Sequence, residues 1–473
     1  MADAPADDSR TKKFLPWLVA IAFFMESLDT TILNTAVPVM AKALDVASLE
    51  MKSVLSSYTL SLAVFIPISS WVADRFGTRR VFFSAIAIFS LGSLLCGISS
   101  NIHFLVASRI LQGCGGAMMV PVGRLVLVRS FARSELIRAM TFVAIPALIG
   151  PMLGPLAGGL IVGLAHWRVI FFVNLPIGIA GMYFVNRYLP DYHEKVDRLD
   201  VSGLILFGTG ISLLSYVLEV FGDHSLGNGE IAALLILALT LVGGYVFHAR
   251  TTKAPLLRLG MFRIRTLRAS VLGNFITRLG VGGLPFLLPL LYQVGLGYSP
   301  IESGLLIMPQ SISALALRLF IGRVLTRFGY RTLLLWNTIA LGVNIAAFGL
   351  IGENTPLAHI IIQSCFYGFF SSTQYTCMNT LVYADVTPSQ TSMASTIVST
   401  VQQLALSFGV ASASLVASLF IPDGSRPVGH EMIVGLQKAF LVLGAFTILS
   451  ALIFRGLRAG DGDNVSLHRS QPV

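Results

Sequence analysis

The chain has 473 residues, of which 55% are apolar and only 12% are charged, about half the charged share of an ordinary soluble protein. Its mean hydropathy of +0.78 excludes a soluble globular fold, which would need far more polar surface, and indicates that the bilayer is the solvent. The formal net charge is +10, and the basic residues that produce it lie between apolar runs and not in one patch. This distribution argues against nucleic acid as a partner.

Apolar runs long enough to span a membrane follow one another along the whole chain. The first comes directly after the polar stretch Met1 to Lys13, is too long for a signal peptide and lacks a clear cleavage site, so we expect it to remain as a membrane helix. The fourteen runs lie near residues 15–40, 54–73, 81–98, 105–128, 139–165, 169–189, 201–220, 231–249, 269–294, 303–325, 332–351, 357–382, 391–421 and 437–454. The sequence therefore predicts an all-α integral membrane protein.

Basic residues are distributed very unevenly between the two sides of these spans. Of the 33 Lys and Arg residues, 24 fall in the tails and in loops on the side of the tails, 5 fall in the loops of the other side, and 4 lie within spans. Cytoplasmic loops carry the excess of Lys and Arg. We therefore expect a multi-pass protein of a bacterial cytoplasmic (inner) membrane with both termini in the cytoplasm.

A short motif on the basic side occurs twice. Arg75-Phe76-Gly77-Thr78-Arg79 recurs as Arg327-Phe328-Gly329-Tyr330-Arg331, after the second and the tenth span. The repeat predicts two six-helix bundles related by an axis along the membrane normal, with two extra helices between them. The expected divisions are 1–190 for the first bundle, 191–250 for the inserted helices, 251–456 for the second bundle and 457–473 for a cytoplasmic tail. Only the first copy has an acid before it, because Asp74 corresponds to Thr326.

Five segments together resemble a known family. They are Ser70–Arg80, Leu105–Gly116, Gly150–Gly159, Leu28–Pro38 and Trp167–Gly178, which match in order its G-x-L-A-D-R-x-G-R-K loop, its R-x-x-Q-G-x-G motif, its G-P-x-x-G-P-x-x-G-G antiporter motif and two subgroup motifs. The chain is thereby identified as a member of the major facilitator superfamily, similar to the fourteen-helix drug:proton antiporters and among them to HsrA- and MdtD-type bacterial multidrug exporters. The resemblance implies the major facilitator fold and alternating access.

Charged residues within the first and fourth spans are the expected proton-coupling site. Asp29 lies mid-span, where an apolar environment favours the uncharged carboxyl, so it can exchange protons near neutral pH. Glu26 is three residues earlier on the same helical face, and either acid could carry the proton. The resemblance implies a role in proton coupling for Arg109. The alternative for the two acids is a structural hydrogen bond between helices, and for Arg109 it is a structural tether to a backbone carbonyl.

The other candidate residues fall into three groups. Asp74, Arg75, Gly77 and Arg79 are expected to form a latch that holds the two halves together in one state, unless the arginines only set topology. The glycines and prolines of the antiporter motif are expected to allow close helix packing and to bend the fifth helix; they are Gly150, Pro151, Gly154, Pro155, Gly158 and Gly159. Polar residues within spans are possible cavity residues or helix-bonding groups; they are Asn34, Tyr58, Gln112, Arg278, Gln402 and Gln403.

The pattern points to a transporter of small molecules and protons with no enzymatic activity. The four cysteines lie inside apolar runs with no metal-binding spacing, and no cofactor or metal is expected. The leading hypothesis is a proton-coupled exporter of lipophilic or cationic compounds that functions as a monomer in the bilayer. An exporter of one metabolite, such as a sugar, an amino acid or a siderophore, is the alternative. A lipid-modifying enzyme is a remote one, because no G-x-S-x-G or H-E-x-x-H motif is present.

Overall fold

A computed structural model describes residues 8–223, 226–421, 428–458 and 460–466. All regular secondary structure in these ranges is helical, and its fourteen long helices confirm the order expected from the apolar runs. Eleven described segments are long and apolar enough to cross a bilayer, and the remaining long helices are α7, α14 and α16. A helical bundle is the arrangement in which every backbone polar group of such a chain is satisfied within its own segment.

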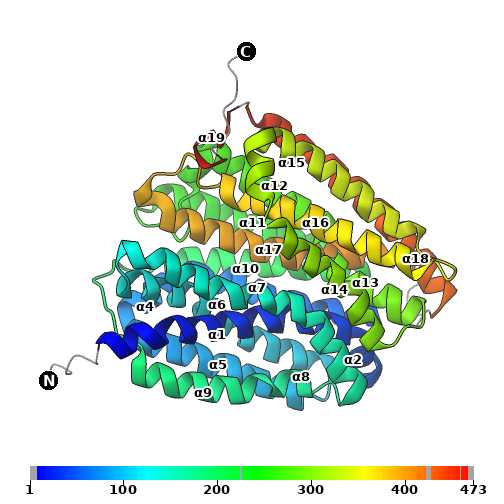
Figure 1. Cartoon of the computed structure of the whole chain (residues 1–473), viewed down its shortest axis with the longest axis horizontal. Coiled ribbons are helices and arrows are strands. Elements are labelled where there is room, and N and C mark those ends of the chain that lie inside the picture. Colours follow the sequence, from blue (N-terminus) through cyan, green and yellow to red (C-terminus); the bar gives the residue numbers. More distant parts are fainter. Residues whose placement is uncertain (1–7, 224–225, 422–427, 459, 467–473) are drawn as a thin grey trace.

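The helical segments between Asp8 and Tyr188 form the lower part of Figure 1. The long helices are α1 (Asp8–Ile32), α3 (Lys52–Phe65), α5 (Thr78–Ile98), α6 (Ile102–Ser130), α7 (Arg133–Leu164) and α9 (Asn174–Tyr188). The short helices α2 (Val37–Ala43), α4 (Ser69–Phe76) and α8 (Val169–Phe172), with the 3-10 turns at Asn34–Ala36, Ser48–Met51 and Ile66–Ile68, extend them. Within this N-terminal half, α1 packs against α7 and α6, and α5 packs against α6 and α9.

The last helices form the upper part of Figure 1. They are α12 (Arg265–Val281) with α13 (Leu284–Pro289), α14 (Pro300–Leu317), α15 (Ile321–Ala347), α16 (Leu357–Leu381), α17 (Thr391–Ser418), α18 (His430–Ser450) and the short α19 (Asp463–Ser466). Shorter helical turns cover Leu259–Arg263, Leu290–Gly295, Phe348–Leu350, Pro388–Gln390 and Ala451–Gly456. Within this C-terminal half, α14 packs against α16, α15 against α18, and α12 against α17.

The inserted helices α10 (Val201–Asp223) and α11 (Asn228–Thr251) pack against each other, and α10 contacts both halves through α3 and α17. The carboxylate of Glu219 on α10 accepts a hydrogen bond from Ser56 of α3, and its backbone oxygen accepts one from Lys52 Nζ at 3.0 Å. Glu219 is therefore bonded to the second span.

The two halves meet at one end of the molecule. With fourteen crossings, both described chain ends lie on one face, here called the terminal face, and the other is called the opposite face (Figure 1). Near the opposite face, Gln293 Nε2 donates to the backbone oxygen of Thr35 at 2.8 Å, and Ser407 donates to that of Ser56 at 3.1 Å. One hydrophobic cluster there joins residues of both halves.

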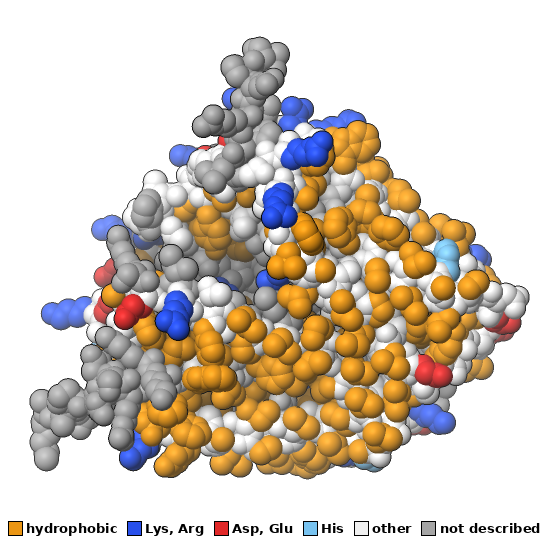
Figure 2. All heavy atoms as spheres, viewed as in Figure 1, with side chains coloured by type: hydrophobic (Ala, Val, Ile, Leu, Met, Phe, Trp, Pro, Cys, Tyr) orange, Lys and Arg blue, Asp and Glu red, His pale blue; other side chains and the backbone are white. Residues whose placement is uncertain are grey.

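The outer surface fits a membrane environment. Figure 2 shows a broad hydrophobic surface with charged side chains gathered at its two ends. The same view is hollowed between the two halves on the side of the terminal face, where the halves diverge. The molecule is thus closed between its halves at the opposite face and open at the terminal face.

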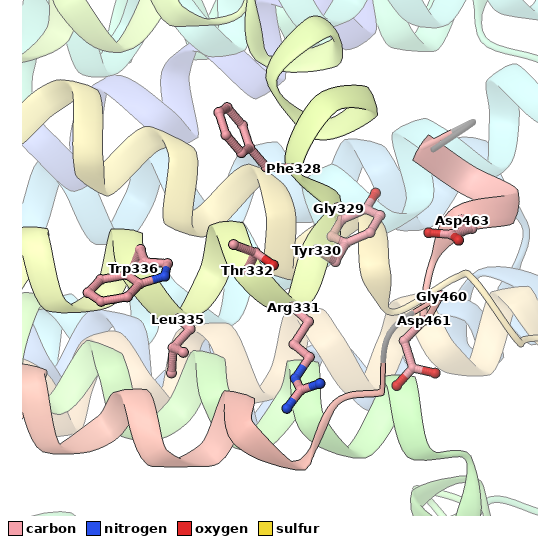
Figure 3. Close-up of a pocket in the computed structure, with 10 residues that line it drawn as sticks. All are labelled: Phe328, Gly329, Tyr330, Arg331, Thr332, Leu335, Trp336, Gly460, Asp461 and Asp463. Carbon is pink, nitrogen blue, oxygen red and sulfur yellow. The ribbon is translucent and has the colours of Figure 1, made fainter. Parts of the chain in front are cut away.

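Both copies of the repeated loop turn at their central glycine. Gly77 has φ 95° and Gly329 has φ 67°, a conformation that favours glycine. In each half, the segment after the last helix of that half packs on this loop: Tyr192 N donates to Thr78 at 2.9 Å, and Gly462 lies against the ring of Tyr330. The second loop and the C-terminal segment enclose a pocket of about 270 Å³ (Figure 3).

Candidate functional site

Asp29 and Arg109 form a sealed ion pair inside the N-terminal half. Asp29 lies on α1 one turn before that helix breaks at Asn34, and Arg109 lies on α6. Arg109 Nη1 is 2.6 Å from Asp29 Oδ2, and both residues are only 1% exposed. The ring of Tyr58 on α3 lies against the guanidinium, 4.1 Å from its carbon to the ring centroid. Three helices therefore converge on one buried charge pair.

Polar side chains complete the coordination of this pair. Gln112 Nε2 donates to Asp29 Oδ1 at 2.8 Å, and its Oε1 accepts from Arg109 at 2.6 Å. Asn174 Nδ2 donates to the same Asp29 oxygen at 3.2 Å and to Ser93 Oγ at 3.0 Å. Both carboxylate oxygens of Asp29 therefore accept hydrogen bonds from side chains of other helices.

Two of these residues were not among the sequence-derived candidates. Asn174 stands within the segment Trp167–Gly178 that resembles the family, but nothing in its local pattern separates it from a helix-bonding amide. Ser93 is one of many serines in apolar runs, and no sequence signal identifies it. Its hydroxyl donates to the backbone oxygen of Phe171 at 2.9 Å, which fixes it beside Asn174.

Glu26 lies one turn from Asp29 but outside the network. Its side chain is half-buried and makes no direct hydrogen bond to a described residue. Arg124 on α6 and Asp29 are the charged groups that act on it. The two acids that the sequence placed together therefore have different surroundings: Asp29 is sealed and paired, whereas Glu26 is half-buried and has no ion-pair partner among the described residues.

The expected cavity residues are not brought together around the ion pair. Asn34 is 9% exposed and lies in the closed end of the molecule, next to the cluster that joins the halves. Gln402 and Gln403 are half-buried on α17, and Gln403 Oε1 has no hydrogen-bond partner among the described residues. Arg278 is buried on α12 in the C-terminal half. Of this group, Gln112 and Tyr58 alone touch Arg109.

The antiporter motif places glycines where α7 meets two other helices. A Cβ atom on Gly150, Gly154 or Gly158 would collide with α1, for instance 2.8 Å from Thr31 Cβ in the case of Gly154. A Cβ on Gly159 would lie 3.0 Å from the carbonyl carbon of Pro300 on α14 in the other half.

The two motif prolines also face neighbouring helices through their backbone oxygens. Pro155 O accepts from Thr35 at 3.0 Å, and Pro151 O accepts from Ser311 of α14 at 3.3 Å. Helix α7 continues through both prolines. The motif therefore lies at the seam between the halves as well as against α1.

The loop cluster is confined to the N-terminal half in this conformation. Asp74 pairs with Arg129 at the end of α6 at 2.8 Å, and Arg129 also pairs with Glu194 at 2.7 Å. Arg79 donates to the backbone oxygen of Leu189 at 2.7 Å, while Arg75 is exposed. In the C-terminal half, Asp461 of the C-terminal segment pairs with Arg265 instead. An acid thus lies at both loops, although in the second half it comes from another segment.

The comparisons with known proteins agree with this architecture. The model of the Major Facilitator Superfamily matches residues 19–410 and 270–470. MdtD of Serratia proteamaculans (strain 568), named as a proposed multidrug resistance protein, is 40% identical over 404 residues, 85% of each chain. MdtD of Shigella flexneri serotype 5b (strain 8401) is 38% identical over 464 residues, 96% of each chain.

Solved structures with low sequence identity share the fold. The peptide-transporter-family protein PepTSo has a TM-score of 0.70 at 16% identity, covering 94% of this chain and 97% of its own. A D-xylose–proton symporter has a TM-score of 0.65 at 13% identity, covering 94% and 97%. The chain belongs to the Major Facilitator Superfamily.

Proposed function

We propose that this protein is a proton-coupled antiporter that exports small lipophilic or cationic compounds by alternating access, as a monomer in a bacterial inner membrane. Its similarity to proteins named for multidrug resistance supports export of more than one compound. The observation that carries the proton coupling is the sealed pair of Asp29 and Arg109, 2.6 Å apart inside the N-terminal half.

The described conformation corresponds to one end of the transport cycle. The excess of Lys and Arg on the terminal face supports a cytoplasmic position for that face, so the hollow between the halves opens to the cytoplasm. Here Asp29 is charged and bonded to Arg109, Gln112 and Asn174. This is the state in which a proton has been released inward and the compound is taken up.

Protonation of Asp29 from the outer side supplies the driving step. A neutral carboxyl bonds Arg109 and Gln112 less strongly, so the packing of α1 against α6 differs between the two protonation states. Each charge moved across the membrane gains about 2.3 kcal/mol per 100 mV, which drives accumulation outside. Glu26, half-buried one turn away on α1, relays or modulates the proton.

The loop cluster and the antiporter motif then control the equilibrium between the two states. The pair of Asp74 and Arg129 holds the loop when the terminal face is open, and the cluster of Asp74, Arg75, Gly77 and Arg79 contacts the other half when that face closes. Close packing of α7 on α14 keeps the opposite face tight while the terminal face is open, which prevents a leak.

The test is an antiport assay in inside-out vesicles that hold an acid interior. A panel of lipophilic and cationic compounds is added, and the collapse of the pH gradient is followed by fluorescence. We expect several compounds to collapse the gradient with the wild type and none with Asp29→Asn. Lys438→Gln, at an exposed position of α18 in the C-terminal half, is the matched control. Collapse that persists in Asp29→Asn would refute Asp29 as the carrier, and collapse by one metabolite alone would identify a single-substrate exporter.

A further inference from the structure

Arg278 is another deeply buried cation, and unlike Arg109 it forms no ion pair with an acid among the described residues. It lies on α12 and is 5% exposed. No carboxylate of a described residue forms an ion pair with it, and the titratable side chains that act on it are those of Tyr375 and Tyr367. An arginine keeps its charge in proteins, so this charge is not neutralised by any carboxylate in the part of the chain that the structure describes.

The guanidinium is positioned by one of its nitrogens only. Nε donates to Asn274 Oδ1 at 2.6 Å, and Asn274 Nδ2 in turn donates to Asn379 Oδ1 at 3.3 Å. The ring of Tyr375 lies against the guanidinium, with its centroid 3.8 Å from the guanidinium carbon. These contacts fix the plane of the group from two sides.

The two terminal nitrogens of Arg278 remain available. They donate to no described residue. If they were fully buried, they would count among the buried polar atoms that lack a hydrogen-bond partner, and they do not. The small exposed part of this residue therefore includes the end that carries the donors. A planar fork of free N–H groups at the end of a buried cation is the geometry that binds a carboxylate or a similar oxyanion in two places.

The internal repeat shows that this cation is a feature of one half. An offset of 252 residues relates Arg278 to Glu26, so the equivalent position on α1 holds an acid. In the N-terminal half the buried arginine is neutralised by Asp29, whereas in the C-terminal half no described acid takes that place.

We propose that Arg278, held by Asn274 and Tyr375, binds an anionic group, a carboxylate or a sulfonate, on the compounds that this protein transports. The inference rests on the proposed export function and narrows the lipophilic part of its substrate class to compounds with an anionic group on an aromatic or lipophilic body. The ring of Tyr375 beside the guanidinium supplies an aromatic surface for that body.

The test compares matched pairs of ligands in equilibrium binding, without any gradient. Benzoate, 2-naphthoate and 4-phenylbutyrate are titrated against their carboxamides by calorimetry, with the full chain in phosphatidylcholine nanodiscs. We expect the wild type to bind at least one acid about 10- to 100-fold more tightly than its carboxamide, the range for hydrogen bonds to a charged group. In Arg278→Gln the two members of the pair should bind equally, and Arg278→Lys should recover part of the preference.

Arg318→Gln is the matched control, because Arg318 is an exposed arginine at the end of α14, and it should keep the wild-type preference. Should Arg278→Gln not fold, inorganic sulfate must displace the acid from the wild type and leave carboxamide binding unchanged. A wild type without preference, or a preference that survives in Arg278→Gln, overturns the proposal. Loss of acid binding in phosphatidylglycerol nanodiscs would show a lipid headgroup at Arg278 and would overturn it as well. Because no proton gradient is used, these outcomes are independent of whether Asp29 carries the proton.

Discussion

At the scale of single residues, the central feature is a charge pair that would be unfavourable in the membrane if either member stood alone. Asp29 and Arg109 are both 1% exposed, and each oxygen of the carboxylate has a donor. Taking two ions out of water is costly, and their attraction with well-placed hydrogen bonds offsets that cost. The pair is therefore more sensitive to losing one partner than to losing both.

This asymmetry gives a prediction for stability. Asp29→Asn or Arg109→Gln alone should lower the free energy of unfolding by about 3–5 kcal/mol, because each leaves an uncompensated buried group. The double variant Asp29→Asn/Arg109→Gln should lose clearly less than the two single losses combined. Thermal unfolding in detergent measures all four proteins, with Lys438→Gln as the control. Additive losses would mean that the two side chains do not depend on each other.

At the scale of helices, the glycines of α7 serve two different neighbours. Gly154 faces α1 within the same half, and Gly159 faces Pro300 of α14 in the other half. The contact of α7 with α1 lies within one half, which moves as a unit in alternating access, whereas the contact with α14 lies on the seam that has to open.

The two positions should therefore respond differently to the same substitution. We expect Gly154→Val to lower thermal stability strongly, because a side chain there meets Thr31. Gly159→Val should fold but open the opposite face. A cysteine in place of the buried Ser303 on α14, in a background without the four natural cysteines, should then react with a water-soluble maleimide faster than in the parent. Equal reactivity in the parent and in Gly159→Val would show that the seam tolerates the side chain.

The inserted helices are joined by a carboxylate at the start of α10 and the end of α11. Asp200, directly before α10, accepts hydrogen bonds from Gly203 N at 2.8 Å and Leu256 N at 3.1 Å and bonds His248 of α11 at 2.7 Å. Burial raises the pKa of Asp200, but these hydrogen bonds outweigh burial and hold the pKa below its usual range. The charged form is therefore the one that ties α10 to α11.

A pKa lowered in the folded state means that Asp200 stabilises the protein above the ordinary carboxyl range, and that this contribution is lost as the pH falls through the lowered value. Asp200→Asn should lower the melting temperature at pH 7, and the difference from the wild type should shrink below about pH 4. Asp197→Asn, an exposed acid three residues away, should show no such difference. The readout is the melting temperature from pH 7 to pH 3; a gap that stays constant over this range would contradict the assignment.

At the scale of the whole molecule, the sequence predicted those features that the bilayer imposes. Span length and hydropathy fixed the fourteen helices, and the repeated loop indicated equivalent turns that Gly77 and Gly329 both adopt with positive φ. Side-chain contacts between helices that are far apart in the sequence were harder to predict. Asp29 and Arg109 were expected to act together because of the family resemblance. Asn174, which completes the carboxylate's bonds, lies 145 residues away and carries no distinguishing local pattern.

Ion-pair partners that lie in loops could not be predicted from the local sequence pattern either. Nothing near Asp74 indicates that Arg129 at the end of α6 pairs with it, since both also fit a cluster that only sets topology. The same holds for Asp461, which lies in a segment expected to be a plain tail and instead pairs with Arg265 beside the second loop. Contacts of this kind depend on the path of the chain after the last helix of each half, which helical periodicity does not encode.

The orientation of the whole molecule in the membrane is the last consequence of its charge distribution. The terminal face carries most of the loop arginines and lysines, so it should face the cytoplasm, where the membrane potential and the anionic leaflet retain positive charge. In a background without the natural cysteines, Asn354→Cys, exposed between α15 and α16 on the opposite face, should react with an impermeant maleimide added to intact cells. Lys195→Cys, exposed on the terminal face, should react only after the cells are broken. Equal labelling of both positions in broken cells is the control for their exposure. If instead Lys195→Cys reacted in intact cells and Asn354→Cys did not, the hollow would open outward and the described conformation would be the one that releases the exported compound.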